Sequence, residues 1–200
     1  MKIKELNIGA LLYAVFSLLI LSQTVIADEK IAAGEFLKNK LDTVFTVLQK
    51  KDLAQQAKNR EVVEIVTPMF NFPLMAKLSL GRKYWPDLTQ DKKDRFTELF
   101  IKRLRQSYLD KLTTYTDEKM IYESPVAVKK KIHIPTHLIS KGKKISMLYK
   151  LYPSNNIWKI YDIEIQGVSI IRSYRSQFRE ILAKGTFDDL LQRMQKSVNN

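Results

Sequence analysis

The chain between residues 29 and 112 carries the three- and four-residue spacing of apolar side chains that is typical of amphipathic helices. The first stripe, over residues 29–51, comprises Ala33, Leu37, Leu41, Val44 and Leu48. A shorter helix is predicted over residues 58–66 and ends at Pro68, because proline cannot continue a helix. The clearest stripe lies in a helix predicted over residues 89–112, capped by Thr89, and comprises Phe96, Leu99, Phe100, Leu104, Tyr108 and Leu112.

Residues 72–80 depart from this pattern, because only Lys77 and Ser79 are polar among them. Asn71 is a suitable N-cap, and Pro73 is tolerated in a first helical turn. Gly81 stands where a helix C-terminus commonly places glycine. The segment therefore predicts a helix of two to three turns, which is too short to span a bilayer. Without a polar face it is either part of the core or the wall of a pocket.

After Tyr115 the apolar period changes from 3.6 to 2, which predicts β-strands. There are four such runs, "KMIYESPVAV", "KKKIHIPTHLIS", "KKISMLYKLYP" and "IWKIYDIEIQGVS". The residues that share a face in the last two runs are Ile145, Met147, Tyr149 and Leu151, and Ile157, Tyr161, Ile163 and Ile165. The short spacings between the runs indicate antiparallel hairpins and a curled meander.

Two helices are predicted after the strands, over residues 170–183 and 186–196, on either side of Gly185. The predicted fold class is therefore α+β, with N-terminal helices, a four-stranded curled antiparallel sheet and two C-terminal helices. The helices are expected to pack on one face of the sheet. No repeat or flexible linker interrupts residues 28–200, so these residues are expected to form a single domain.

The N-terminus has the three-part layout of a secretory signal. Lys2 and Lys4 precede an apolar run of about 14 residues, and Val25 and Ala27 are small residues at the positions that a signal peptidase needs. We expect residues 1–27 to be a signal peptide cleaved after Ala27, and the mature protein to be periplasmic. The alternative is an uncleaved anchor, but a spanning helix needs roughly 20 apolar residues.

Charge and cysteine content narrow the class of partner. The chain has a formal charge of +13, and removal of Lys2, Lys4 and Glu5 with the signal leaves +12. An exported basic protein rarely meets nucleic acid, so anionic lipid or an acidic partner protein is the expected counterpart. The chain has no cysteine, which excludes thiol chemistry and cysteine-ligated metals.

No catalytic constellation stands out. His133 and His137 are four residues apart on a predicted strand, which separates them by about 13 Å and prevents them from sharing a metal. The sequence "GVS" lacks the full nucleophile-elbow pattern, and no glycine-rich phosphate loop is present. Asp162 and Glu164 share a strand face without a partner acid or base nearby in sequence. No enzymatic activity, metal or cofactor is expected.

The chain resembles the MlaC family, also called toluene-tolerance auxiliary, in three stretches that occur in the expected order. They are "FNFPLMAKLSLGRKYWPDLTQDKKDRFTELFIKRLRQSYLDKL", "WKIYDIEIQGVSIIRSYRSQFREIL" and "GTFDDLLQRM". The resemblance runs from about residue 35 to the C-terminus. It implies a monomeric periplasmic carrier that shuttles phospholipid between an outer-membrane lipoprotein complex and an inner-membrane ABC transporter complex. The ABC complex hydrolyses ATP, and the carrier performs no covalent chemistry.

The resemblance also implies an apolar cavity between the curled sheet and the helices, with the lipid headgroup near its mouth. The residues predicted to bind lipid are Phe72, Met75, Leu78, Leu80, Tyr84, Trp85, Phe96, Phe100, Met147, Tyr149, Tyr161, Ile163 and Val168. The residues predicted to contact the headgroup or a protein partner are Arg82, Lys83, Lys129, Lys130 and Lys131. Ordinary core packing is the alternative role for each lipid-binding position, and a solvated surface is the alternative for the cations.

Two other functions remain compatible with the residues. The chain could be a secreted interaction module whose apolar groove binds a protein partner, or it could carry another lipid, such as a hopanoid. A hydrolase is disfavoured, because only two histidines and no cysteine are available as base or nucleophile.

Overall fold

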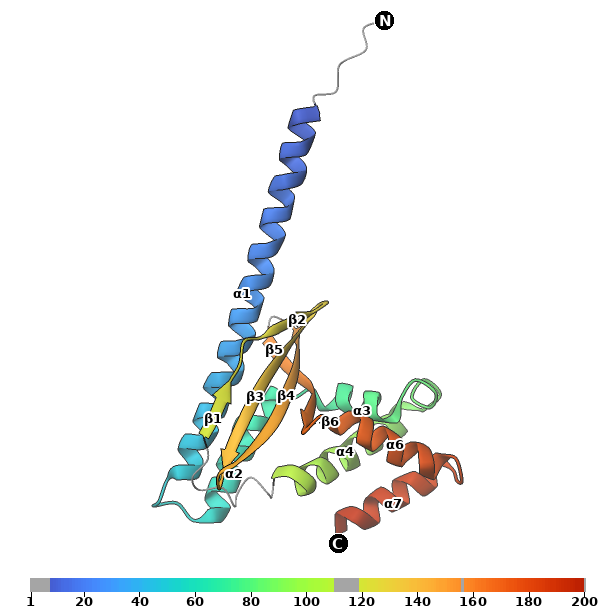
Figure 1. Ribbon diagram of the computed structural model, residues 1–200. Helices are drawn as coiled ribbons and strands as arrows, with labels where there is room; N and C mark the ends of the chain where they lie inside the picture. The colour runs from blue at the N-terminus through green and yellow to red at the C-terminus, as the bar shows by residue number, and fades with distance from the viewer. Residues whose placement is uncertain (1–7, 110–118, 156, 200) are drawn as a thin grey trace, which may run out of the picture.

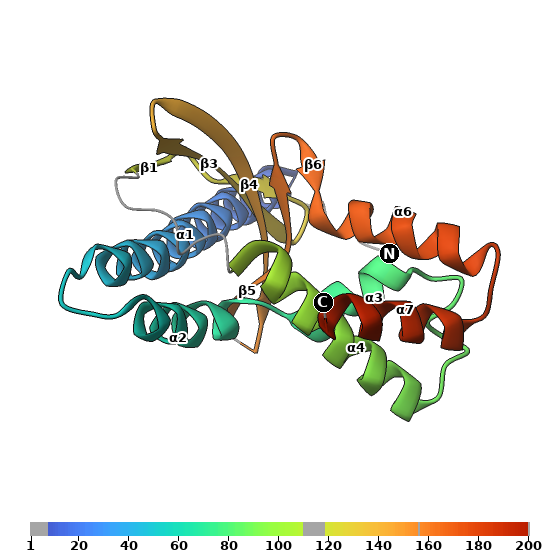
Figure 2. The same cartoon turned by 90° about the horizontal axis from the view of Figure 1, so that it is seen from below.

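A curled antiparallel sheet lies between a long N-terminal helix and a group of shorter helices in the computed structural model of this chain (Figure 1). The structure describes the backbone of residues 8–109, 119–155 and 157–199, and the side chains of residues 28–107, 119–155 and 157–198. Helix α1, which packs on α2, contacts β2 and β3, whereas α3 and α6 contact β5, and α4 and α7 pack beyond them (Figures 1 and 2). Both groups of helices contribute residues to a cavity on the same face of the sheet. The predicted α+β class is confirmed.

The helices follow the predicted order. They are α1 (Ile8–Gln49), α2 (Gln55–Val66), α3 (Phe72–Leu80), α4 (Gln90–Leu104), α6 (Ile170–Leu182) and α7 (Phe187–Asn199). A 3₁₀ turn, Thr67–Met69, follows α2, and a π-helical turn, Arg105–Leu109, follows α4. Helix α1 begins earlier than predicted. The last part of the helix predicted over residues 89–112 lies outside the described residues.

Helix α3 has the predicted bounds, because both of its ends are set by local chemistry. The side chain of Asn71 accepts a hydrogen bond from the backbone N–H of Leu74 at 2.9 Å. Pro73 lies in the first turn, where its missing N–H has no helical partner to lose. Gly81 has φ of +87°, a conformation that costs little without a Cβ. The backbone N–H of Asn71 also bonds to the carbonyl of Ile160 at 2.9 Å, which ties the start of α3 to the sheet.

Within the described residues the sheet has six strands, and the predicted count of four is wrong. The strands are β1 (Lys119–Tyr122), β2 (Val126–Val128), β3 (Lys131–Ser140), β4 (Lys143–Ser154), β5 (Ile157–Ile165) and β6 (Val168–Ser169). The first predicted run is divided at Pro125, which has no N–H to donate to a ladder. The fourth run is divided by a turn at Gln166 and Gly167, both with positive φ. All strand pairs are antiparallel, in the order β1-β3-β4-β5-β6, with β2 also paired to β3.

The start of α6 is fixed to β5 by a buried carboxylate. Asp162 accepts hydrogen bonds from Ser169 Oγ at 2.8 Å and from the backbone N–H of Ile171 at 3.2 Å. Lys150 Nζ lies 3.1 Å from the same carboxylate and 2.6 Å from Glu164. Asp162 therefore holds the start of the helix to the sheet.

An aromatic part of the core joins the C-terminal helices. The ring centroids of Phe96 and Phe178 lie 5.3 Å apart at a steep angle, and those of Phe100 and Tyr174 lie 5.2 Å apart. Such edge-to-face contacts are favourable for aromatic pairs. Leu190 and Met194 of α7 are also fully buried. This core holds α4, α6 and α7 together, away from the curled part of the sheet.

Nothing in the structure tests the predicted signal peptide, since the side chains of residues 1–27 are outside the described set. Among residues whose side chains are described, no helix is both long and apolar enough to cross a membrane.

Candidate functional site

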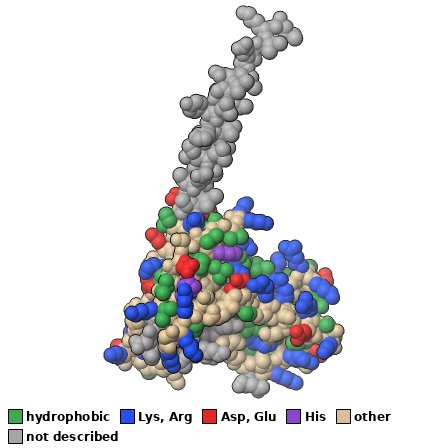
Figure 3. All heavy atoms as spheres, viewed as in Figure 1, with side chains coloured by type: hydrophobic (Ala, Val, Ile, Leu, Met, Phe, Trp, Pro, Cys, Tyr) green, Lys and Arg blue, Asp and Glu red, His purple; other side chains and the backbone are tan. Residues whose placement is uncertain are grey.

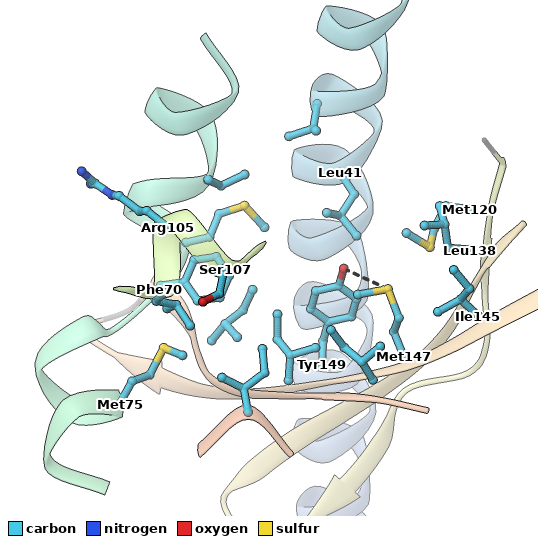
Figure 4. A pocket seen from close by; sticks show the side chains of 18 of the residues that line it. Leu41, Phe70, Met75, Arg105, Ser107, Met120, Leu138, Ile145, Met147 and Tyr149 are labelled. Carbon is cyan, nitrogen blue, oxygen red and sulfur yellow. Dashed lines mark hydrogen bonds between the residues drawn. The ribbon is translucent and has the colours of Figure 1, made fainter. Parts of the chain in front are cut away.

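A cavity of about 340 Å³ lies between the C-terminal half of α1, the α2–α3 connection and the curled face of the sheet (Figure 4). This volume falls within the range of about 300 to 1,000 Å³ that is usual for small-molecule sites. The lining residues from the helices and their connections are Leu41, Val44, Phe45, Leu48, Val66, Met69, Phe70, Phe72, Met75, Leu104, Arg105, Ser107 and Ile170. The lining residues from the sheet are Met120, Leu138, Ile145, Met147, Tyr149, Ile160, Ile163 and Ile165.

The periodicity of the sequence places these side chains on facing surfaces. In β4, alternate residues from Ile145 to Tyr149 point to the cavity, because successive strand side chains alternate between faces. Strand β5 continues the same surface, with Ile163 opposite Tyr149 and Ile165 opposite Met147. Helix α1 supplies the opposite wall from its apolar stripe.

The wall is almost entirely apolar. Among its described residues, polar side-chain groups come only from Arg105, Ser107 and Tyr149. The Tyr149 hydroxyl lies 3.9 Å from Met147 Sδ, a weak acceptor (Figure 4). Burial raises the pKa of the Tyr149 phenol well above its usual value, so this group stays neutral in the cavity. Such a surface suits a hydrocarbon chain and offers little to a polar ligand.

Metal or acid–base chemistry finds no support at this site. The described residues contain no group of three or more His, Asp or Glu side chains placed to hold a metal. His133 lies on the opposite face of the sheet, where its Nε2 is 3.1 Å from the Tyr161 hydroxyl. His137 pairs with Glu123. The two histidines thus have separate partners away from the cavity.

Five of the residues predicted to bind lipid lie in the cavity wall. They are Phe72, Met75, Met147, Tyr149 and Ile163. Phe72 and Met75 come from α3, and the other three come from the curled centre of the sheet. The structure thus brings together residues that are 72 to 91 positions apart in the sequence.

The other eight predicted residues lie outside this wall. They are Leu78, Leu80, Tyr84, Trp85, Phe96, Phe100, Tyr161 and Val168. Phe96 and Phe100 face α6 and α7 in the aromatic core, and the Trp85 ring packs 6.3 Å from Phe96. Tyr161 lies on the opposite face of β5, next to His133. Val168 is 60% exposed in the two-residue strand β6.

The predicted headgroup cations are also remote from the cavity wall. Arg82 and Lys83 are exposed in the loop after α3. Lys129, Lys130 and Lys131 are exposed at the turn between β2 and β3. Lys131 Nζ lies 4.1 Å from the centroid of the Tyr161 ring, on the face of β5 away from the cavity. Lys and Arg side chains are spread over the visible surface, with few acidic side chains among them (Figure 3).

Sixteen of the 21 residues of the wall were not among the predicted lipid contacts, and the α1 residues and Arg105 show why. The α1 residues Leu41, Val44 and Leu48 belong to a predicted apolar stripe, but nothing in the stripe distinguishes pocket from core. Arg105 carries the only charge among the described lining residues. In the sequence it lies within the highly charged helix predicted over residues 89–112, where a single arginine does not stand out.

Comparison with known proteins places this fold and sequence in one family. The family model described as MlaC protein matches residues 38–196. The intermembrane phospholipid transport system binding protein MlaC of Haemophilus influenzae is 27% identical over 138 residues. That match covers 66% of this chain and 64% of the relative, just under two thirds of its length.

A solved structure has the same fold. It is the phospholipid-binding protein from Ralstonia solanacearum in complex with a phospholipid, at 21% identity and a TM-score of 0.75. The alignment covers 84% of this chain and 97% of that protein. With the family model matching most of the sequence, the chain belongs to the MlaC family.

Proposed function

We propose that this chain is a periplasmic lipid carrier that holds phospholipid acyl chains in the cavity between α1 and the sheet. The observation that carries the proposal is the almost wholly apolar wall of a cavity of about 340 Å³. An apolar pocket with very few polar groups recognises hydrocarbon by excluding water from it.

The energetics of lipid transfer explain why such a carrier needs a cavity. Two sixteen-carbon chains contain about 30 methylene groups, and each contributes about 0.8 kcal/mol when buried. Exposing both chains to water would cost about 25 kcal/mol, so free monomeric lipid is negligible. The carrier must enclose most of the chains and must load and unload while docked on a membrane complex.

The relatives support the same cargo. The Haemophilus relative is named as the binding protein of an intermembrane phospholipid transport system, and the Ralstonia protein was solved with a phospholipid. We propose that this chain shuttles phospholipid between an outer-membrane lipoprotein complex and an inner-membrane ABC transporter complex as a monomer. Residues 1–27 would direct it to the periplasm.

We propose Phe72, Met75, Met147, Tyr149 and Ile163 as lipid contacts, together with the α1 side of the wall. Methionine suits such a wall because its unbranched side chain adapts to chains of different shape. The carrier role needs no nucleophile, base or metal, and none is assigned. The exposed cations Arg82, Lys83 and Lys129 to Lys131 are proposed as contacts for acidic surfaces of the membrane complexes.

The direct test is native mass spectrometry of the protein purified from cells that express the full chain. We expect bound phospholipid in the wild type, and its loss in Met147→Glu, which places a carboxylate in the cavity wall. Ile121→Glu is the matched control, since Ile121 is 47% exposed and outside the cavity. Circular dichroism checks that both variants fold.

Two results would contradict the proposal. One is a wild-type protein that carries no lipid and accepts none from vesicles. The other is lipid retention that Met147→Glu leaves unchanged. A stable protein complex without lipid would favour an interaction module with an apolar groove.

A further inference from the structure

Arg105 is the one charged side chain among the described residues that line the cavity. It begins the π-helical turn that follows α4, and such turns occur often at functional sites. Figure 4 shows Arg105 at one end of the cavity, with Met120, Leu138 and Ile145 at the other. Its nitrogen atoms point away from Tyr149 and from the apolar end of the cavity. The cavity therefore has a cationic end and an apolar end.

The guanidinium of Arg105 is poorly satisfied. Its Nη2 donates one long hydrogen bond of 3.3 Å to Thr67 Oγ1. Its Nε is buried and has no hydrogen-bond partner, and no ion pair involves this residue within the described parts of the chain. A guanidinium has five donors in a planar fork that matches the oxygens of a phosphate or carboxylate. A buried donor on a charged group is costly unless something pairs with it.

Three other basic side chains near the sheet have partners for their charged groups, which distinguishes them from Arg105. Lys150 contacts two carboxylates on the far face of the sheet. Arg172 pairs with Glu164, and both Nε and Nη2 of Arg175 donate to the carbonyl of Leu78. Arg105 thus combines position at the cavity with unused donors.

We propose that Arg105 binds the phosphate of the lipid headgroup at the rim and so fixes the direction in which the cargo lies. This inference rests on the proposed carrier function. The fork of Arg105 meets the phosphate oxygens, and Ser107 adds a neutral hydroxyl on the same turn. The acyl chains then extend past Tyr149 toward Met120 and Ile145. The preferred cargo is a lipid with an anionic phosphate, ahead of a neutral lipid with the same chains.

The test compares two lipids that differ only in the headgroup. Phosphatidylglycerol and diacylglycerol with the same acyl chains compete against a fluorescent phospholipid analogue for the full-length protein. In the wild type, phosphatidylglycerol is expected to bind more tightly. Arg105→Gln is expected to weaken phosphatidylglycerol about tenfold to hundredfold, as loss of a charge-assisted hydrogen bond does. Diacylglycerol binding should stay within about twofold.

Additional variants distinguish phosphate binding by Arg105 from effects on folding or on overall charge. Arg105→Lys keeps the charge and should restore part of the preference. Arg105→Met keeps the apolar stem and should behave as Arg105→Gln does, so the result does not depend on the folding of one variant. Arg103→Gln is the matched control, because Arg103 lies 5.7 Å from the Tyr174 ring and outside the cavity wall. It should leave both lipids unaffected.

Three other results would contradict the inference, and each points to a different cause. If Arg105→Gln weakens both lipids equally, the residue supports the fold and not the headgroup. If the wild type binds inorganic phosphate and Arg105→Gln does not, the site binds free phosphate and not a lipid headgroup. If the wild type binds neither lipid, the carrier function fails and this inference fails with it.

Discussion

Under the proposed carrier function, removing the lipid is expected to lower the free energy of unfolding by several kcal/mol. Empty cavities in protein cores cost about 24 cal/mol per Å³ in lost packing. For a cavity of about 340 Å³ this amounts to about 8 kcal/mol. Natural domains have only about 5 to 15 kcal/mol of stability in total. A cavity of this size, left empty and uncollapsed, would therefore remove much of the stability of the fold.

The value of 8 kcal/mol is an upper limit, because part of the wall is in contact with solvent. Met147, Ile145 and Ile165 are only partly buried, so water or a small inward movement of side chains can recover some of the cost. A difference of about 3 to 8 kcal/mol between lipid-loaded and delipidated protein follows from these limits.

Urea denaturation of the two forms, followed by circular dichroism, measures this difference. The variant Ile163→Phe is measured in the same assay, because its larger ring fills part of the cavity from the centre of the sheet. It should raise the stability of the delipidated protein and reduce the gain on adding phospholipid. Equal free energies of unfolding for loaded and delipidated wild type would refute the reasoning, since the cavity would then cost nothing when empty.

Three further predictions concern stability. Burial, helped by the nearby lysines, lowers the pKa of His133 below its usual value of 6.5, so the unfolded chain binds the proton more readily. The free energy of unfolding should therefore fall as the pH drops from about 7 to about 5, and less so in His133→Gln, as measured by urea denaturation. Asp162→Ala should cost about 3 kcal/mol in the same assay, because it leaves buried donors at the start of α6 unpaired. The exposed Asp87→Ala should cost no more than about 0.5 kcal/mol. Asn71→Ala should cost about 1 kcal/mol through loss of the α3 cap, whereas Asn71→Ser should keep most of that stability.

Features that depend on near neighbours in the sequence could be predicted. The cap at Asn71 and the stop at Gly81 each act within one helical turn, and α3 has the predicted bounds. The alternation along β4 depends only on the pleat, and it places Met147 and Tyr149 on one face as expected. The division of the sheet into six strands depends partly on long-range pairing, which is why the count was underestimated.

Membership of the cavity wall could not be predicted from periodicity. Phe72 and Phe100 are both buried on apolar faces of helices, at 8% and 0% exposure. Phe72 lines the cavity, whereas Phe100 packs against Tyr174 from α6. The difference comes from a helix about 70 residues further along the chain, which no local pattern around Phe100 records. The sequence pattern predicts that a side chain is buried, but it does not predict which residues pack against it.

The position of the cavity follows from how the helices divide their contacts. Helix α1 packs on α2, β2 and β3, whereas α3, α4, α6 and α7 pack mainly on one another and on β5. Aromatic rings fill the space between α4, α6 and α7. No helix packs closely on the centre of the sheet around Met147 and Ile163, and the cavity lies there. The space is bounded by α1 on one side and by the aromatic core on the other. We therefore expect cargo of different size to be accommodated by movement of α1 and α2 against the sheet, while the core around Phe96 stays unchanged.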